Sequence, residues 1–242
     1  MKNLLIYISP NGIEGENERM LKIQIENSLD LGWKLEDIIL ITNFSYEYGG
    51  VKSRVVPDEL YCDFWKQQSK INSILYLFDK GLIEDELYWF HDLDAFQTVP
   101  ITISIDKDIV FTDYGYPHAR IWNTGSFFFN KSAEKTLRMI TERVYKDKTD
   151  EELALRDLIN EGFTDYGKIN ISYNFPGSKG GEKYFELIYN NADKPVKVIH
   201  FHPERRGGRF FRLFCGENSL GIKLMPDRLI NIFNKHGYGS SD

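Results

Sequence analysis

The sequence predicts an α/β protein with a mostly parallel central sheet flanked by helices. Short apolar runs alternate with longer stretches whose apolar residues have helical spacing, which is the pattern of α/β folds. The chain has 242 residues and a hydrophobic content of 42%, so it is long and apolar enough for one large core. No internal repeat or linker-like tract divides it. We therefore expect a single domain over residues 1–242.

The first elements predict a strand–helix–strand unit. Residues 4–9 form a short apolar run that ends in a Pro-Asn-Gly turn, as a buried strand entering a loop would. Residues 16–31 carry apolar side chains at helical spacing and stop at Gly32. Residues 37–44 form a second, isoleucine-rich strand. Two strands joined in this way lie parallel, with a right-handed crossover.

The rest of the chain continues the alternation. Residues 58–80 predict one long helix, which Gly81 closes, and residues 86–90 predict a third strand. Further strands are expected within residues 101–130 and at 196–202, and further helices at 133–145, 151–160 and 226–236. Ligands of open α/β sheets bind beyond the carboxyl ends of the strands. Loops that follow strands are therefore the places where a site is expected.

Composition limits the function classes. The chain has 30 Lys and Arg against 36 Asp and Glu, a net charge of -6, which argues against a protein that coats nucleic acid. Its two cysteines, Cys62 and Cys215, have no metal-type spacing and fit a reducing compartment. No apolar run reaches the ~20 residues of a membrane span, and the one at the start is too short for a signal peptide. We expect a cytoplasmic location.

An Asp-x-Asp pair at the end of the third strand is the sharpest chemical feature. The apolar run Tyr-Trp-Phe is followed by His91, and Asp92 and Asp94 come next in the chain. Oxygen ligands of this kind suit hard divalent ions, which commonly bind one or two carboxylates together with substrate phosphates. The structural alternative is a polar turn after a buried strand.

Two later segments have both a structural and a functional interpretation. Asn123-Thr-Gly125 is a polar bend before an aromatic strand, either a simple hairpin turn or a place where the backbone approaches a ligand. Asp150 and Glu151 begin a helix, where acidic residues also serve as caps. The polar stretch around Asn174 has no mechanism of its own.

The last strand ends in His-x-His. His200 and His202 are two residues apart and so lie on the same face of the strand, and neutral imidazole is a good ligand for Mn²⁺ or Zn²⁺. Arg205 and Arg206 follow in a basic run, and guanidinium groups suit phosphate oxygens. The alternative for this run is a solvated basic loop.

In this order the motifs resemble those of the GT-A family of nucleotide-sugar-dependent glycosyltransferases, over most of the chain. The order is most similar to that of the retaining enzymes of the glycogenin and lipopolysaccharide-galactosyltransferase type. After the late His that type has a Gly and a Lys-Pro-Trp, whereas this chain has a Pro-Glu-Arg-Arg-Gly-Gly run. The stereochemical outcome, retaining or inverting, therefore stays open.

The resemblance implies a GT-A-like, Rossmann-like domain with a nucleotide-binding half at about 1–94 and an acceptor half with the closing segment at about 95–242. It also implies a divalent metal, Mn²⁺ first and Mg²⁺ as the alternative. The implied metal ligands are Asp92, Asp94, His200 and His202. The implied donor-binding residues are Tyr7, Ser9, Lys66, Lys70, Asp92, Asn123, Gly125, Arg205 and Arg206. The implied catalytic residues are Asp150 and Glu151, which would meet an acceptor hydroxyl.

The implied activity is transfer of a sugar from a nucleotide-sugar donor, UDP-linked in such families, to an unidentified acceptor. The acceptor classes are a glycan, a small molecule or a modified nucleic acid. One alternative is a nucleotidyltransferase, which usually has a Gly-rich, basic loop after the first strand; residues 9–15 have glycines but no basic residue. The other is a non-catalytic module that binds a sugar nucleotide or a glycan.

Overall fold

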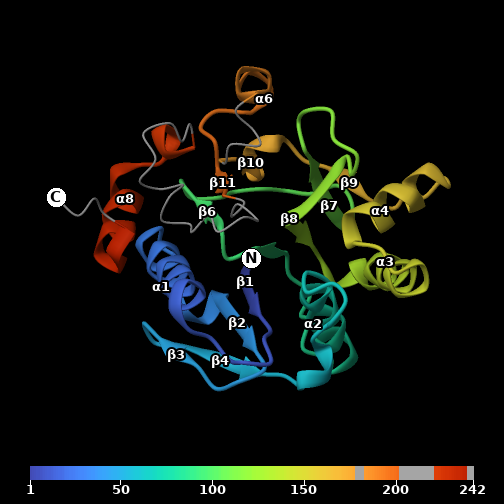
Figure 1. Cartoon of the computed structure of the whole chain (residues 1–242), viewed down its shortest axis with the longest axis horizontal. Helices are drawn as coiled ribbons and strands as arrows, with labels where there is room; N and C mark the ends of the chain where they lie inside the picture. Colours follow the sequence, from blue (N-terminus) through green and yellow to red (C-terminus); the bar gives the residue numbers. More distant parts are fainter. Residues whose placement is uncertain (178–182, 202–220, 239–242) are drawn as a thin grey trace.

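A computed structural model describes residues 1–177, 183–201 and 221–238 (Figure 1). The strands are β1 (Lys2–Tyr7), β2 (Ile38–Thr42), β3 (Glu47–Tyr48), β4 (Val51–Val55), β5 (Tyr88–His91), β6 (Ala95–Gln97), β7 (Ile109–Asp113), β8 (Trp122–Phe129), β9 (Gly167–Lys168), β10 (Phe175–Pro176) and β11 (Val198–His200). The α-helices are α1 (Gly15–Asp30), α2 (Gln68–Asp79), α3 (Glu134–Asp147), α4 (Glu151–Asn160), α6 (Phe185–Asn191) and α8 (Asp227–Phe233).

The central sheet has the strand order β3-β4-β2-β1-β5-β8-β7-β9. β1 pairs in parallel with β2 and β5, β2 with β4, and β7 with β9. β8 runs antiparallel to both β5 and β7, and β3 runs antiparallel to β4. The predicted α/β class, the mostly parallel sheet and the first strand–helix–strand unit are therefore confirmed.

Both faces of the inner strands of the central sheet are buried. Successive side chains of a strand point to opposite faces. Leu4 and Ile6 of β1 accordingly pack in the core with α2, α3 and α4, whereas Leu5 packs with α1. Figure 1 shows α2, α3 and α4 grouped together, away from α1. Burial on both faces explains why the strands read as continuous apolar runs.

A second, smaller sheet brings the late part of the chain to the end of β5. Its order is β10-β11-β6, with β11 antiparallel to β6 and His200 opposite Ala95. A core of aromatic and aliphatic side chains, including Phe96, Phe175 and Phe233, joins this sheet to α1, α6 and α8. β6 follows β5 after a short turn, so this pairing carries His200 to the carboxyl end of the central sheet.

The long helix expected over residues 58–80 is wrong in its first half. A short 3-10 turn at Asp58–Leu60 is followed by irregular chain, and α2 begins only at Gln68. The hydroxyl of Ser69 accepts a hydrogen bond from the backbone N–H of Cys62 at 2.9 Å. The indole N–H of Trp65 donates to Glu151 of α4, so this irregular stretch contacts both helices. The late strand is also shorter than expected, because β11 ends at His200.

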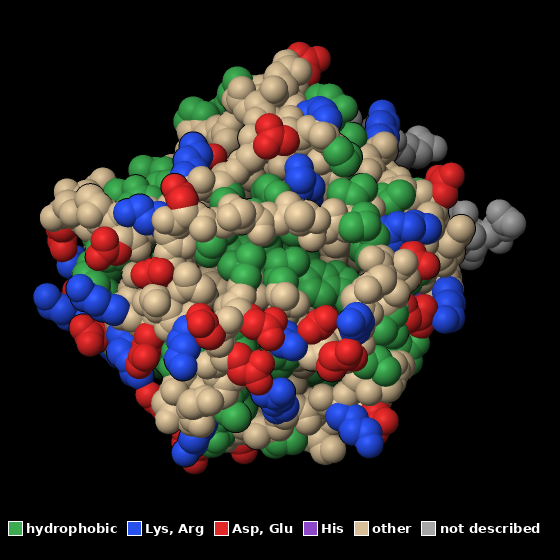
Figure 2. All heavy atoms as spheres, turned by 180° about the vertical axis from the view of Figure 1, so that it is seen from behind, with side chains coloured by type: hydrophobic (Ala, Val, Ile, Leu, Met, Phe, Trp, Pro, Cys, Tyr) green, Lys and Arg blue, Asp and Glu red, His purple; other side chains and the backbone are tan. Residues whose placement is uncertain are grey.

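The face shown in Figure 2 carries acidic and basic side chains interspersed around a central hydrophobic area. A mixture of both signs is not the continuous basic surface that a phosphate backbone selects. Within the described ranges we find no helix with the length and apolar character needed to cross a bilayer.

Candidate active site

Two carboxylates and one imidazole meet at the carboxyl end of β5. The backbone N–H of Asp92 donates to the carbonyl of Gly125 at 2.8 Å, and the N–H of Ala95 donates to the carbonyl of Asp92 at 3.0 Å. This turn directs Asp92 and Asp94 toward β11. The Nε2 atom of His200 lies 3.1 Å from Oδ1 of Asp94 and 3.9 Å from Oδ2 of Asp92. One ligand atom from each of these three residues lies within 4.8 Å of the others.

The donor set fits a divalent cation. Carboxylate oxygens and an imidazole nitrogen are ligands for Mg²⁺, Mn²⁺ and Zn²⁺. Burial raises the pKa of Asp92, and Asp94 adds to that effect, while Lys70 and His200 oppose it. Burial lowers the pKa of His200, but the Asp94 carboxylate outweighs it and the pKa is raised. Two neighbouring carboxylates thus concentrate negative charge that a bound cation would neutralise.

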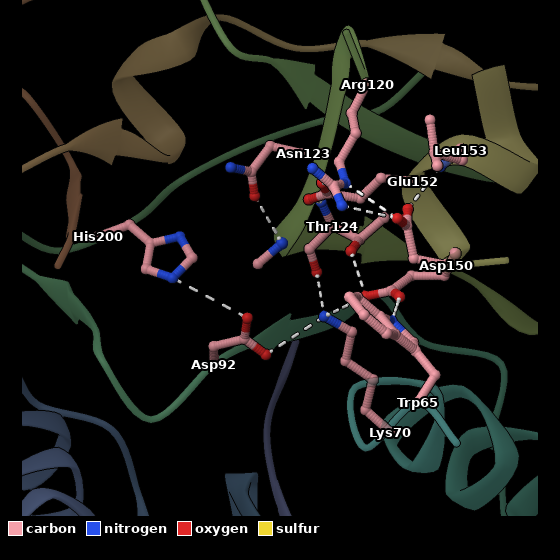
Figure 3. Close-up of polar contacts among 12 residues, drawn as sticks. Trp65, Lys70, Asp92, Arg120, Asn123, Thr124, Asp150, Glu152, Leu153 and His200 are labelled. Carbon is pink, nitrogen blue, oxygen red and sulfur yellow. Dashed lines mark hydrogen bonds and ion pairs between the residues drawn. The ribbon is translucent and has the colours of Figure 1, made fainter. Parts of the chain in front are cut away.

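Lys70 links this cluster to helix α4 (Figure 3). Its ammonium lies 3.3 Å from Oδ1 of Asp92 and 3.3 Å from Oε1 of Glu151, and it donates to the carbonyl of Thr124 at 3.0 Å. The other oxygen of Glu151 accepts a hydrogen bond from the indole N–H of Trp65. Lys70 is only 7% exposed. Burial alone would lower its pKa, but the carboxylates of Asp92 and Glu151 raise it, so the lysine stays charged.

The start of α4 is a second acidic group. Asp150 caps the helix by accepting from the backbone N–H of Leu153 at 2.8 Å, and its other oxygen accepts from Arg120 Nε at 3.0 Å. Glu152 accepts from the hydroxyl of Tyr114 at 2.7 Å. Burial raises the pKa of Glu152 to about 7, and the negative charge of Glu151, its neighbour on α4, contributes to the rise.

The Asn-x-Gly bend lies beside the late histidine. Asn123 Oδ1 accepts from the backbone N–H of Gly125 at 2.8 Å and from Asn174 Nδ2 at 2.7 Å. The other end of the Asn174 amide lies 2.9 Å from Nδ1 of His200. A methyl group on Gly125 would come within 2.1 Å of the His200 ring. The bend and the histidine are therefore packed as one unit.

For the other predicted site residues that the structure describes, Tyr7, Ser9 and Lys66, it gives a position but no hydrogen bond or ion pair with the Asp92, Asp94 and His200 cluster. Tyr7 and Ser9 lie at the carboxyl end of β1, beside β5, on the edge of the sheet that carries Asp92. The hydroxyl of Tyr7 accepts from Asn17. Lys66 is exposed and precedes α2. His202, Arg205 and Arg206 lie outside the described residues.

The structure adds site residues that the sequence did not single out. They share polar contacts with the predicted residues: Trp65, Arg120, Thr124, Glu152 and Asn174. Glu152 follows the predicted acidic pair, and Asn174 lay in a polar stretch, so both had a weak signal. Trp65 had none, because a continuous helix was expected there.

No family model matches the sequence, and no curated protein matches it. Solved structures do match. The galactosyltransferase LgtC, in complex with donor and acceptor sugar analogs, is 13% identical, with a TM-score of 0.60 over 100% of this chain and 98% of that chain. The glycosyltransferase GlyE of Streptococcus pneumoniae TIGR4 is 10% identical, with a TM-score of 0.59 over 97% of this chain and 63% of that chain.

A third similar structure is a glycosyltransferase involved in the glycosylation of the major capsid of PBCV-1. It is 12% identical, with a TM-score of 0.51 over 83% of this chain and 93% of that chain. These likenesses define the class of fold, since they cover from 83% to 100% of this chain. The GT-A-like fold expected from the order of the motifs is confirmed.

Proposed function

We propose that this protein is a metal-dependent glycosyltransferase that takes a sugar from a nucleotide-sugar donor. The observation that carries the proposal is the Asp92, Asp94 and His200 cluster at the carboxyl end of β5. It lies on a fold similar to that of LgtC, whose structure contains donor and acceptor sugar analogs. UDP as the nucleotide and Mn²⁺ as the ion are further parts of the proposal.

The metal would be held by Asp92, Asp94 and His200, and His202 remains a further proposed ligand. A divalent ion bound there would neutralise the charge that develops on a departing nucleoside diphosphate. Lys70 holds Asp92 from the opposite side, at 3.3 Å, and so fixes its orientation. The proposed donor contacts are Tyr7, Ser9, Lys66, Lys70, Asp92, Asn123, Gly125, Arg205 and Arg206.

Asp150 and Glu151 are proposed to meet the sugars. Their side chains are almost fully buried, at 5% and 3% exposure, and each is held by hydrogen bonds to neighbouring side chains. Carboxylates fixed in this way are suited to orienting sugar hydroxyls. Residues of about 1–94 would then bind the nucleotide, and residues of about 95–242 would bind the acceptor. The acceptor is a glycan, a small molecule or a modified nucleic acid.

The test is release of nucleoside diphosphate from UDP-, GDP- and CDP-sugars. We expect the protein to release the nucleoside diphosphate from one of these donors, with water accepting the sugar, in Mn²⁺ and not in EDTA. Asp94→Asn should abolish the release, because it removes a charged ligand. The control is Asp79→Asn, which alters an exposed carboxylate at the end of α2 that pairs with Arg138 of α3. This variant should release nucleoside diphosphate as the wild type does.

Release that persists in EDTA or in Asp94→Asn would contradict the metal assignment. Donor binding without release, with and without candidate acceptors, would favour the non-catalytic binding module instead.

A further inference from the structure

We infer that Asn123 and Asn174 form a hydrogen-bond relay that orients His200 and keeps a hydrogen on its Nδ1, so that Nε2 faces the two carboxylates and offers its lone pair to a cation bound between them. Both asparagines are positioning residues that act through the histidine. The inference rests on the metal site proposed above, and it is independent of which nucleotide sugar is the donor.

The relay begins at a backbone group that can only donate. The N–H of Gly125 donates to Oδ1 of Asn123 at 2.8 Å, which fixes the direction of the Asn123 amide. Asn123 is 4% exposed on β8, so water does not compete for this bond. The same oxygen then faces Asn174 at 2.7 Å, and an acceptor oxygen requires a donor there.

The second step fixes the amide of Asn174. Its Nδ2 is the donor to Asn123, and it also lies 3.2 Å from the hydroxyl of Thr112. The Oδ1 atom of Asn174 must then point the other way, and it lies 2.9 Å from Nδ1 of His200. Because an amide oxygen only accepts, Nδ1 of the neutral ring carries the hydrogen.

The third step follows from the ring itself. Nε2 of His200 lies 3.1 Å from Asp94 and 3.9 Å from Asp92. As a metal ligand the ring is neutral, and with its hydrogen held on Nδ1 its lone pair is on Nε2, toward the proposed cation. Metal-ligating histidines commonly donate their other N–H to a carbonyl or carboxylate oxygen, which orients the ring and raises its basicity as a ligand. Asn174 supplies that acceptor here.

The bend also shapes the space for the ring. A Cβ at Gly125 would lie 2.1 Å from Cε1 of His200 and 3.0 Å from Oδ1 of Asn123. The absence of a side chain at this position therefore leaves room for both the ring and the relay. The Asn-x-Gly motif has this structural use whether or not it also contacts a donor.

The test is the affinity of the full chain for Mn²⁺ alone, measured by titration with the free ion followed by paramagnetic resonance. Asn174→Leu should weaken Mn²⁺ binding by about 10- to 100-fold, the cost of losing such an outer partner. The control is Asn27→Leu, which removes another fully buried amide, one that donates to Gln97 and accepts from Arg228. It should leave the Mn²⁺ affinity unchanged. Unfolding in EDTA shows that both variants fold.

A double-mutant cycle separates a relay from general damage. In the His200→Ala background, Asn174→Leu should lower the affinity no further, because the residue that it positions is gone. An Asn174→Leu variant with wild-type affinity, or with the same loss in both backgrounds, would overturn the relay. If His200→Ala itself binds Mn²⁺ normally, the metal site fails, and the relay with it.

A second pair of variants keeps the test open if Asn174→Leu does not fold. Asn123→Asp keeps an acceptor for both Gly125 and Asn174, so the Mn²⁺ affinity should be at least that of the wild type. Asn123→Leu removes the acceptor and should weaken binding. Equal affinities in these two variants would overturn the inference.

Discussion

A single buried lysine holds two acidic parts of the site together. Lys70 pairs with Asp92 at the end of β5 and with Glu151 at the start of α4, each at 3.3 Å. Breaking a buried ion pair by removing one partner leaves an uncompensated charge, which costs more than the pair itself contributes. The geometry of the candidate site therefore depends on this lysine.

Lys70→Met should lower the free energy of unfolding by about 3–5 kcal/mol, because both carboxylates lose their buried cation. Lys66→Met alters an exposed lysine one turn earlier in the chain and should change stability by no more than about 0.5 kcal/mol. Urea unfolding of the two variants checks this. A loss of less than about 1 kcal/mol in Lys70→Met would contradict the assigned role.

Glu152 makes the stability of the protein depend on pH. Its pKa in the folded state is raised from 4.5 to about 7, so folding favours the protonated form. The stabilisation is complete below about pH 4.5 and is lost as pH rises through about 7, a change of up to about 3 kcal/mol. Glu152→Gln should match the wild type in acid and be more stable above pH 7. Parallel stability curves for the two proteins would contradict this, as measured by urea unfolding across pH.

Gly125 tests the packing of the bend against the late histidine. Gly125→Ala should lower the stability by about 1–3 kcal/mol, the usual cost of overpacking, because the added carbon meets the His200 ring at 2.1 Å. The ring must shift, so Mn²⁺ affinity should fall as well. Unfolding in EDTA and Mn²⁺ titration measure the two effects separately. An unchanged affinity would show that the ring position does not matter.

At the scale of elements, helices with local signals were predicted well. Helix α4 occupies Glu151–Asn160, the range that its acidic start and apolar spacing indicate. The predicted 58–80 helix was wrong before Gln68, where the chain is irregular and side chains contact distant partners, as Trp65 contacts Glu151. Local periodicity does not contain contacts between residues 86 apart, so the sequence pattern could not reveal this break.

The cap of α4 gives a prediction at this scale. Asp150→Ser keeps a hydroxyl that can cap the N–H of Leu153, but it loses the contact with Arg120. Asp150→Ala loses both and should be less stable than Asp150→Ser by about 1 kcal/mol. Urea unfolding compares the two variants directly. Equal stabilities would show that the cap contributes nothing measurable.

At the scale of the whole molecule, the order of the motifs predicted the class of fold. It also predicted the three residues of the candidate metal cluster, Asp92, Asp94 and His200. The βαβ start and the Asp-x-Asp pair have local signals, and parallel strands bring their carboxyl ends to one edge. The tertiary partners could not be predicted in the same way. His200 meets Asp94 across 106 residues through the pairing of β11 with β6. The Asn123–Asn174 contact likewise joins residues 51 apart, from β8 and from the residue before β10.

The measurement that most directly tests the proposed metal-dependent binding of a nucleotide sugar is a thermal-shift panel. It would compare UDP, GDP, CDP and their sugar conjugates, each with Mn²⁺ and with EDTA. A ligand that binds only the native state raises the apparent stability by mass action. We predict a rise in Tm with one nucleotide and its sugar conjugate that occurs only with Mn²⁺ and disappears in Asp94→Asn. No shift with any of them, at concentrations well above the expected affinities, would contradict the proposed function.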